Sequence, residues 1–301
     1  MHSGHDGRYA PSPSGPLHLG NLRTALLAWL FARSQGARFV LRIEDLDPDR
    51  SRAEHAERAL ADLAAIGLDW DGSPLRQSDR GALYREAFEH LRAAGRVYPC
   101  WCSRAEIRAA ASAPHAAEGE CYPGTCRRLS ARERAAREAA RPPSAWRLDA
   151  RSESVAFSDA LHGRRSGTVD DFVIWRGDGV AAYNLAVVVD DAAQGIGEVV
   201  RGDDLLATTP RQVLLQRLLA LPTVRYAHVP LVIGADGQRL AKRHGAVTLA
   251  DRLARGEQLT DVLAWLASSS GLQKVARPAR AGDLLDGFDP SAIVREPAVL
   301  A

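Results

Sequence analysis

The chain has 301 residues, of which 46% are hydrophobic and 25% are charged, and this length is sufficient for one or two domains with a substantial buried core. Its 39 basic and 37 acidic residues leave a formal net charge of only +2, which excludes a globally basic nucleic-acid-binding chain and requires any such surface to be local. No long apolar run predicts a membrane span, and the start MHSGHDGRYAP lacks the apolar region of a signal peptide, so we expect a cytoplasmic protein.

A β-α-β unit is the first structure that the sequence predicts. Residues 8–10 form a short strand, after which several prolines exclude regular structure. Apolar residues then recur at helical spacing between residues 22 and 32, and Gly36 ends this helix. Residues 38–43 form a second strand, parallel to the first. Ligands collect at the carboxyl ends of such strands.

The loop that enters the first helix contains a candidate phosphate site. His18 and Asn21 lie where the first N–H groups of the helix have no partner within it, which favours an anion. Gly20 would allow a nucleotide to approach the backbone, and an imidazole could stabilise charge that develops on an attacked phosphate. The alternative is a proline-rich surface turn whose helix is capped by Asn21.

Acidic residues and two further helices follow the second strand. Glu44 and Asp45 lie just past its carboxyl end, where a ligand is expected, although acids at this position are also typical of a solvated turn. Residues 53–66 form an amphipathic helix that ends before Gly67, and a third helix begins at residue 78 or 79 and continues to residue 94.

The four cysteines of the chain fall within 27 residues of one another, between residues 100 and 126. They are too few and too clustered for a disulfide scaffold, and their spacing predicts a four-ligand zinc site in a reducing compartment. On chemistry alone a fourth thiol is a better zinc ligand than a phenol, because a thiol loses its proton more easily. The candidates in this segment are Cys100, Cys102, Cys121, Cys126, Tyr122 and His115.

The middle of the chain reads as an inserted region. Residues 127–141 predict a charged helix, which is solvated by default and could alternatively face RNA phosphates. Residues 145–157 predict a pair of strands and residues 171–175 a third. The core is expected to resume at Val180.

Two buried strands are predicted where the core resumes. Residues 183–189 are almost entirely apolar, which is typical of a central parallel strand buried on both faces. Residues 196–200 form another, and Arg201 lies at its end. The acidic pairs Asp190–Asp191 and Asp203–Asp204 could contact ribose, Mg²⁺ that accompanies a nucleotide, or helix N-termini.

The last third of the chain contains the basic motif RLAKR at residues 239–243. It follows a predicted strand at 229–233 and a turn at 235–237. Two helices are expected at 248–253 and 259–267, and prolines and glycines interrupt the remainder.

Together these motifs resemble a known family. PSPSGPLHLGNLRTALLAW followed by LRIEDLDPDR is similar to the start of glutamyl-type class I aminoacyl-tRNA synthetases, with HLGN at the HIGH position and RLAKR at the KMSKS position. The resemblance implies an α/β fold with a Rossmann-like parallel sheet, and ATP bound with Mg²⁺. It assigns ATP binding to His18, Gly20, Asn21 and Lys242, with His18, Asn21 and Lys242 catalytic. Arg239 and Ala241 replace a lysine and a serine of the family motif, which puts the rate in question more than the reaction.

The resemblance also implies a glutamate site. It places Glu44 on the amino group, and Tyr183 and Arg201 at positions that contact the substrate. A guanidinium can hold the side-chain carboxylate in a bidentate pair, which would favour glutamate over glutamine. Arg8 is a second candidate for that carboxylate, and Ser12 completes the expected set.

Short relatives of the family carry a C-x-C then Y-x3-C arrangement, which implies Cys100, Cys102, Tyr122 and Cys126 as ligands of one structural zinc ion. Cys121 remains the alternative fourth ligand. Four protein ligands would leave no open position for a substrate.

Residues 244–301 are too short for the helical anticodon-binding domain of glutamyl-tRNA synthetases. The resemblance therefore implies the short branch of the family, which activates L-glutamate with ATP and transfers it to queuosine at the wobble position of tRNA(Asp). We expect a monomer with four parts: two catalytic halves (1–95 and 179–245), a zinc-containing insertion (96–178) and a helical C-terminal segment (246–301). The alternatives are a minimal enzyme that charges tRNA(Glu), a small-molecule nucleotidyltransferase and a non-catalytic RNA-binding paralogue.

Overall fold

A computed structural model describes residues 4–103, 105–107, 122–238, 240, 244–245, 247–272 and 277–300. Its largest sheet has seven strands, of which six run parallel and β7 is antiparallel to β6. In spatial order they are β3 (Leu75–Arg76), β2 (Phe39–Ile43), β1 (Gly7–Tyr9), β9 (Glu198–Gly202), β10 (Arg225–Val229), β6 (Ser154–Asp159) and β7 (Gly163–Thr168). The predicted parallel pairing of the first two strands is confirmed.

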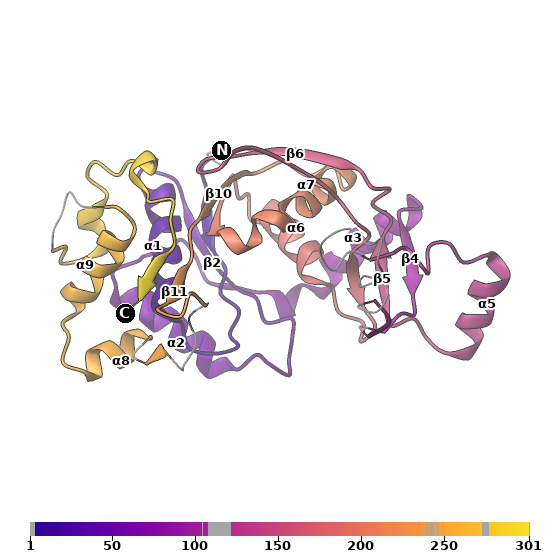
Figure 1. Cartoon of the computed structure of the whole chain (residues 1–301), viewed down its shortest axis with the longest axis horizontal. Helices are drawn as coiled ribbons and strands as arrows, with labels where there is room; N and C mark the ends of the chain where they lie inside the picture. Colours follow the sequence, from indigo (N-terminus) through magenta and orange to yellow (C-terminus); the bar gives the residue numbers. More distant parts are fainter. Residues whose placement is uncertain are drawn as a thin grey trace.

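Two smaller sheets flank this one. The strands β4 (Val97–Cys100), β5 (Ala145–Leu148) and β8 (Val173–Arg176) form an antiparallel sheet, and β11 (Val232–Gly234) pairs in parallel with β12 (Ala298–Leu300). In Figure 1 β4, β5 and the exposed helix α5 (Ala131–Ala140) lie at one end of the molecule, and β11 lies near the other.

Helices cover both faces of the large sheet. Successive side chains of a strand point to opposite faces, and the buried clusters follow this alternation: Val199 and Tyr226 belong to one, Val200 and Ala227 to the other. The first cluster includes α3 (Gly81–Ala93), α6 (Tyr183–Ala193) and α7 (Thr209–Leu218). The second includes α1 (Leu19–Arg33), α2 (Ala53–Ala65), α8 (Leu249–Ala254) and α9 (Leu259–Ser269). The fold is therefore a three-layer α/β structure.

One predicted strand is wrong. The apolar run that begins at Tyr183 is the helix α6, which starts after Ala182 in extended backbone conformation. Its residues Leu185 to Asp191 are all buried, because α3 and α7 pack on it while it covers the sheet. A helix surrounded on nearly all sides loses the polar stripe that would otherwise show helical periodicity.

Two further details differ from the sequence prediction. The strands β5 and β6, expected as a pair, belong to different sheets: β5 pairs with β4 and β8, while β6 pairs with β10 and β7. The single strand expected at 229–233 is interrupted at Pro230 and Leu231: Val229 is the last residue of β10, and β11 begins at Val232. The helices expected at 53–66, 248–253 and 259–267 are confirmed as α2, α8 and α9. The four-part division of the chain stays a prediction.

Candidate functional site

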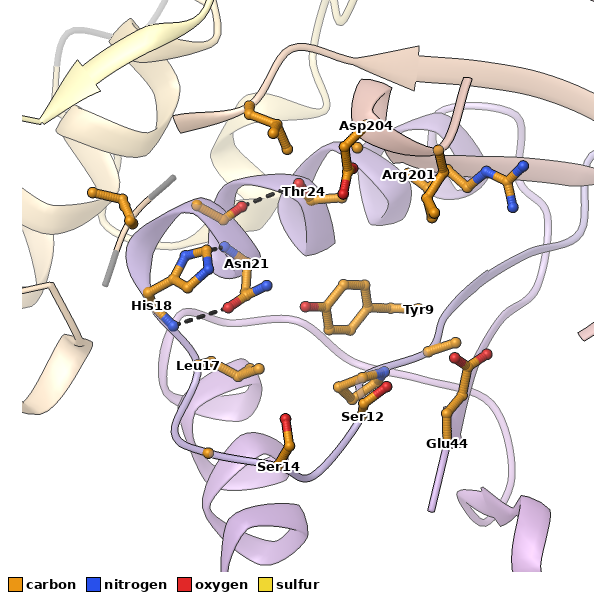
Figure 2. Close-up of a pocket in the computed structure, with 18 of the residues that line it drawn as sticks. Tyr9, Ser12, Ser14, Leu17, His18, Asn21, Thr24, Glu44, Arg201 and Asp204 are labelled. Atoms are coloured by element: carbon orange, nitrogen blue, oxygen red, sulfur yellow. Dashed lines mark hydrogen bonds between the residues drawn. The ribbon is translucent and has the colours of Figure 1, made fainter. Parts of the chain in front are cut away.

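A cavity of about 650 Å³ opens at the carboxyl ends of β1, β2 and β9. The strand β1 lies between β2, reached through α1, and β9, which comes much later in the chain. Ligands of open α/β sheets bind at such a change of direction. Most of the predicted site residues line this cavity, namely Ser12, His18, Gly20, Asn21, Glu44, Tyr183 and Arg201. Figure 2 shows Ser12, His18, Asn21, Glu44 and Arg201 around the cavity.

His18 is the N-cap of α1 and has its ring nitrogens in distinct roles. Nδ1 accepts from the backbone N–H of Asn21 at 3.2 Å, and the Asn21 side chain accepts from the His18 N–H at 3.1 Å (Figure 2). Burial lowers the pKa of His18, so the ring is neutral at neutral pH. Because Nδ1 is the acceptor, the proton of the neutral ring is on Nε2, which can donate to an anion.

Gly20 allows His18 to take this position. A Cβ on Gly20 would lie 3.0 Å from two atoms of the His18 ring and 3.2 Å from the Cβ of Val232. A side chain there would therefore displace the imidazole or β11. Gly20 was predicted to let a nucleotide approach the backbone. In the structure, the absence of a side chain at Gly20 leaves room for the imidazole of the capping residue His18.

The opposite wall of the cavity contains the groups expected to hold an amino acid. Glu44 follows β2 directly, and burial raises its pKa while the Arg42 and Arg8 guanidiniums oppose this shift. Tyr183 begins α6 and is 39% exposed, so its phenol is accessible from the cavity. A carboxylate and a guanidinium in one cavity can bind the ammonium and carboxylate groups of one zwitterionic ligand.

Arg201 is the buried cation of this wall, at 5% exposure. All three of its nitrogens donate to neutral groups: Nη1 to Gln212 at 2.7 Å, Nη2 to Thr209 at 2.9 Å and Nε to His228 at 3.0 Å. Each terminal nitrogen carries a second N–H, so the guanidinium keeps donors for a bidentate partner. Sequence reasoning placed Arg201 at a strand end and missed the three residues that orient it.

Arg8 lies beneath the cavity and does not line it. Its Nε donates to Asp191 at 3.3 Å, and its Nη1 donates to the carbonyl of Val200 at 3.3 Å. Asp191 also pairs with the fully buried Arg42 at 2.8 Å, and Arg42 reaches Glu44 at 3.4 Å. The carboxylate of Asp191 thus connects α6 to β1 and β2, and through Arg42 it is linked to Glu44.

The two acidic pairs whose roles were left open have different surroundings. Asp190 is buried and accepts from Gln77, Arg80 and Tyr84 at 2.6 to 2.8 Å. Asp190 and Asp191 therefore hold neighbouring elements together, whereas Asp204 lines the cavity. Lys242, with Arg239 and Ala241 of the same motif, lies outside the described residues.

A second candidate site lies beside β4, remote from the cavity. The sulfurs of Cys100, Cys102 and Cys126 lie within 4.8 Å of one another, and those of Cys102 and Cys126 are 3.5 Å apart. The Tyr122 hydroxyl is 3.5 Å from the Cys100 sulfur and 3.6 Å from the Cys102 sulfur. Cys121 and His115, the alternative ligands, lie outside the described residues.

These donor atoms fit a zinc ion. In a tetrahedral site, Zn–S bonds of about 2.3 Å put two sulfurs about 3.8 Å apart, and a Zn–O bond of about 2.1 Å puts an oxygen about 3.6 Å from a sulfur. The observed separations are close to both values. The guanidinium of Arg147 lies 3.8 Å over the Tyr122 ring and donates to Cys100, which would favour negative charge on these ligands.

Residues 6–264 match the family model described as tRNA synthetases class I (E and Q), catalytic domain. The chain belongs to this family. Members of the class I synthetase family (E and Q) bind ATP and are ligases, so the chain is an enzyme of the ligase type. The glutamyl-type resemblance of the two motifs is thereby confirmed at the level of the family.

Individual relatives agree with this class I synthetase assignment. A protein of Nocardia farcinica named glutamyl-Q tRNA(Asp) synthetase is 60% identical over 98% of this chain and 92% of its own length. One of the same name from Symbiobacterium thermophilum is 53% identical over 97% and 94%. A glutamate tRNA ligase from Elizabethkingia meningosepticum, crystallised with its amino acid, has a TM-score of 0.85 at 26% identity, covering 99% of this chain and 67% of the ligase.

A further similar protein has a different name. The protein named glutamate–tRNA ligase 2 of Alkalilimnicola ehrlichii is 41% identical over 97% of this chain and 64% of its own length.

Among the helices of the described part of the chain, none is both long and apolar enough to cross a membrane.

Proposed function

We propose that this protein activates L-glutamate with ATP, without RNA, and transfers the glutamyl group to queuosine at the wobble position of tRNA(Asp). The observation that carries the proposal is one cavity lined by the capped helix N-terminus at His18 together with Glu44 and Arg201. The names of the relatives that are 60% and 53% identical over nearly the whole chain support the choice of RNA acceptor.

In the first step the α-carboxylate of glutamate attacks the α-phosphate of ATP, which is bound with Mg²⁺. The P–O bond to the β-phosphate breaks, so that glutamyl-adenylate forms and pyrophosphate leaves. The His18 Nε2–H and the N-terminus of α1 stabilise the added charge, and Lys242 would contribute a further cation. The cavity chiefly positions the reactants, and no covalent enzyme intermediate is needed.

The amino acid would lie across the other wall of the cavity. Glu44 pairs with its ammonium group, and Arg201 pairs with its side-chain carboxylate, with Tyr183 and Ser12 beside them. Glutamine would leave the buried Arg201 charge without a partner, which disfavours it. In the second step a hydroxyl of the queuosine cyclopentene diol attacks the mixed anhydride, and AMP leaves.

The decisive experiment is glutamate-dependent ATP–pyrophosphate exchange, followed by transfer of labelled glutamate to purified RNA. We expect exchange without RNA, and labelling of tRNA(Asp) only when it contains queuosine. Labelling of tRNA(Glu) instead would identify a minimal charging enzyme, a reading favoured by the relative named glutamate–tRNA ligase 2. A protein without exchange would be a non-catalytic RNA-binding relative, and exchange independent of glutamate would indicate another nucleotidyltransferase.

We further propose that Cys100, Cys102, Tyr122 and Cys126 bind one structural zinc ion. Substitution of cobalt for zinc tests the ligand set, because sulfur-to-cobalt charge-transfer bands increase with the number of thiolates. Three thiolates are expected, with a spectrum changed by Tyr122→Phe and unchanged by Cys121→Ser. A spectrum that changes with Cys121→Ser alone would identify the alternative ligand.

A further inference from the structure

A buried chain of polar side chains runs from β6 to the guanidinium of Arg201. His228, on β10, has its Nδ1 2.6 Å from the Oδ2 of Asp159 at the end of β6, and its Nε2 accepts from the Nε of Arg201 at 3.0 Å. The side chains of Asp159 and His228 are both fully buried. Sequence motifs gave no indication of either residue.

The contacts fix the position of the proton on His228. Arginine has only donors, so the nitrogen that faces Arg201, Nε2, must carry the lone pair. The proton of the neutral ring is then on Nδ1, where it is donated to Asp159. Burial, the largest influence, lowers the pKa of His228, which keeps the ring neutral at neutral pH.

Asp159 is itself held in one orientation. Its Oδ1 accepts from the backbone N–H groups of Leu161 and His162, each at 3.0 Å, which directs Oδ2 towards the ring. A carboxylate anchored in this way selects the Nδ1–H form of the histidine, as carboxylates do for histidines elsewhere.

We propose that Asp159 and His228 are positioning residues that hold Arg201 in the orientation required for the side-chain carboxylate of the substrate; this rests on the function proposed above. The acceptors around Arg201 are an imidazole, an amide and a hydroxyl, so its orientation is fixed by neutral groups. Arg8, by contrast, pairs with a carboxylate. The charge of Arg201 is therefore left for the ligand.

Asp159→Asn tests the chain of contacts with almost no change of shape. The two backbone N–H groups retain the amide oxygen at the Oδ1 position, so the amide NH₂ faces His228. The ring proton then moves to Nε2 and opposes the Arg201 Nε–H. We expect the KM for glutamate in the exchange reaction to rise about tenfold or more, with a smaller effect on kcat and weaker discrimination against glutamine.

Two substitutions of His228 separate positioning from packing. His228→Gln can place its amide oxygen near the Nε2 position and still accept from Arg201, whereas His228→Asn can only reproduce the donor to Asp159. We therefore expect KM for glutamate to rise less in the glutamine variant than in the asparagine variant. Asp171→Asn is the matched control: it alters a buried carboxylate that accepts from Tyr98 at 2.6 Å and from Arg127 at 3.1 Å rather than from Arg201 or His228, and it should leave KM unchanged.

The proton position can be measured without any reaction. Long-range ¹H–¹⁵N spectra distinguish protonated from unprotonated ring nitrogens, and the His228→Gln variant identifies the His228 signals among the nine histidines. An unprotonated Nε2 in the wild type, which becomes protonated in Asp159→Asn, is the expected result. A protonated Nε2 in the wild type, or an unchanged KM in Asp159→Asn, would overturn the positioning role. Wild-type protein that fails to exchange with glutamate would instead refute the proposed function and leave the spectroscopic result standing.

Discussion

The carboxylate of Glu44 is acted on by burial and by two arginines in opposite directions. Burial is the larger influence and raises its pKa above the ordinary value, while Arg42 and Arg8 oppose the rise. Only ionised Glu44 can pair with the ammonium group of glutamate. As the pH falls through this raised pKa the ionised fraction falls, so the KM for glutamate should increase at a pH where an exposed glutamate would still be charged.

The measurement is KM for glutamate in the exchange reaction between about pH 5 and pH 8. An exposed glutamate side chain, with a pKa of about 4.3, stays mostly ionised over this range. Glu44→Gln should have a high KM at every pH and lose the acidic increase, whereas Ser12→Ala should retain it. A wild-type KM that does not change with pH would show that Glu44 does not bind the ammonium group.

His18 combines two roles that one substitution can separate. Asparagine is among the best N-cap residues, so His18→Asn should keep the cap of α1 and lose only the Nε2–H donor. We expect kcat for exchange to fall about 10²- to 10³-fold, as for the loss of one hydrogen-bond donor to a developing charge. The free energy of unfolding in urea should stay unchanged. His18→Ala should lose the donor and also about 1 kcal/mol of stability. Equal kcat values for His18→Asn and the wild type would remove His18 from the chemistry.

The helix α6 is joined to β1 and β2 by one buried carboxylate. Although burial alone would raise the pKa of Asp191, the Arg42 and Arg8 guanidiniums outweigh it and hold that pKa below its usual value. The stability that Asp191 contributes is therefore present above its unfolded pKa of about 3.9 and is lost as the pH falls further.

Asp191→Ala should leave two buried guanidiniums without their shared partner and lower the free energy of unfolding by about 3–5 kcal/mol at neutral pH. Urea denaturation at pH 7 measures the difference, and the exposed Asp286→Ala serves as control. A loss equal to that of the control would mean that solvent or neighbouring acids already compensate these arginines.

Elements whose pattern is local were predictable, and those defined by distant neighbours were not. The β1–α1–β2 unit follows from its own prolines, helical spacing and Gly36. The helix α6 was mistaken for a strand because α3 and α7 bury the side that would have shown its period. Within the site, the residues that reach the cavity lie in recognisable motifs. The pairings that support them were not predictable, because the partners are distant in the chain: Asp159 and His228 are 69 positions apart, and Arg8 and Asp191 are 183 apart.

At the scale of the whole molecule, the described residues form three separate apolar clusters. Two lie on the faces of the large sheet, and the third is small and contains Trp101 with the cysteines and Tyr122. The five buried residues of this cluster in the described chain supply little hydrophobic stabilisation by themselves, and we expect this part of the fold to use a further source of energy. A bound zinc ion would provide it, since structural sites contribute folding energy directly.

Removal of the metal should therefore unfold one part of the molecule and spare the rest. After chelation, hydrogen exchange should increase in peptides that cover β4 and residues 122–129, while α1 and β9 stay protected and glutamate-dependent exchange persists. Cys126→Ser should reproduce this pattern in untreated protein. Loss of protection in α1 as well would show that the clusters unfold together, and protection unchanged everywhere would show that the thiols need no metal to pack.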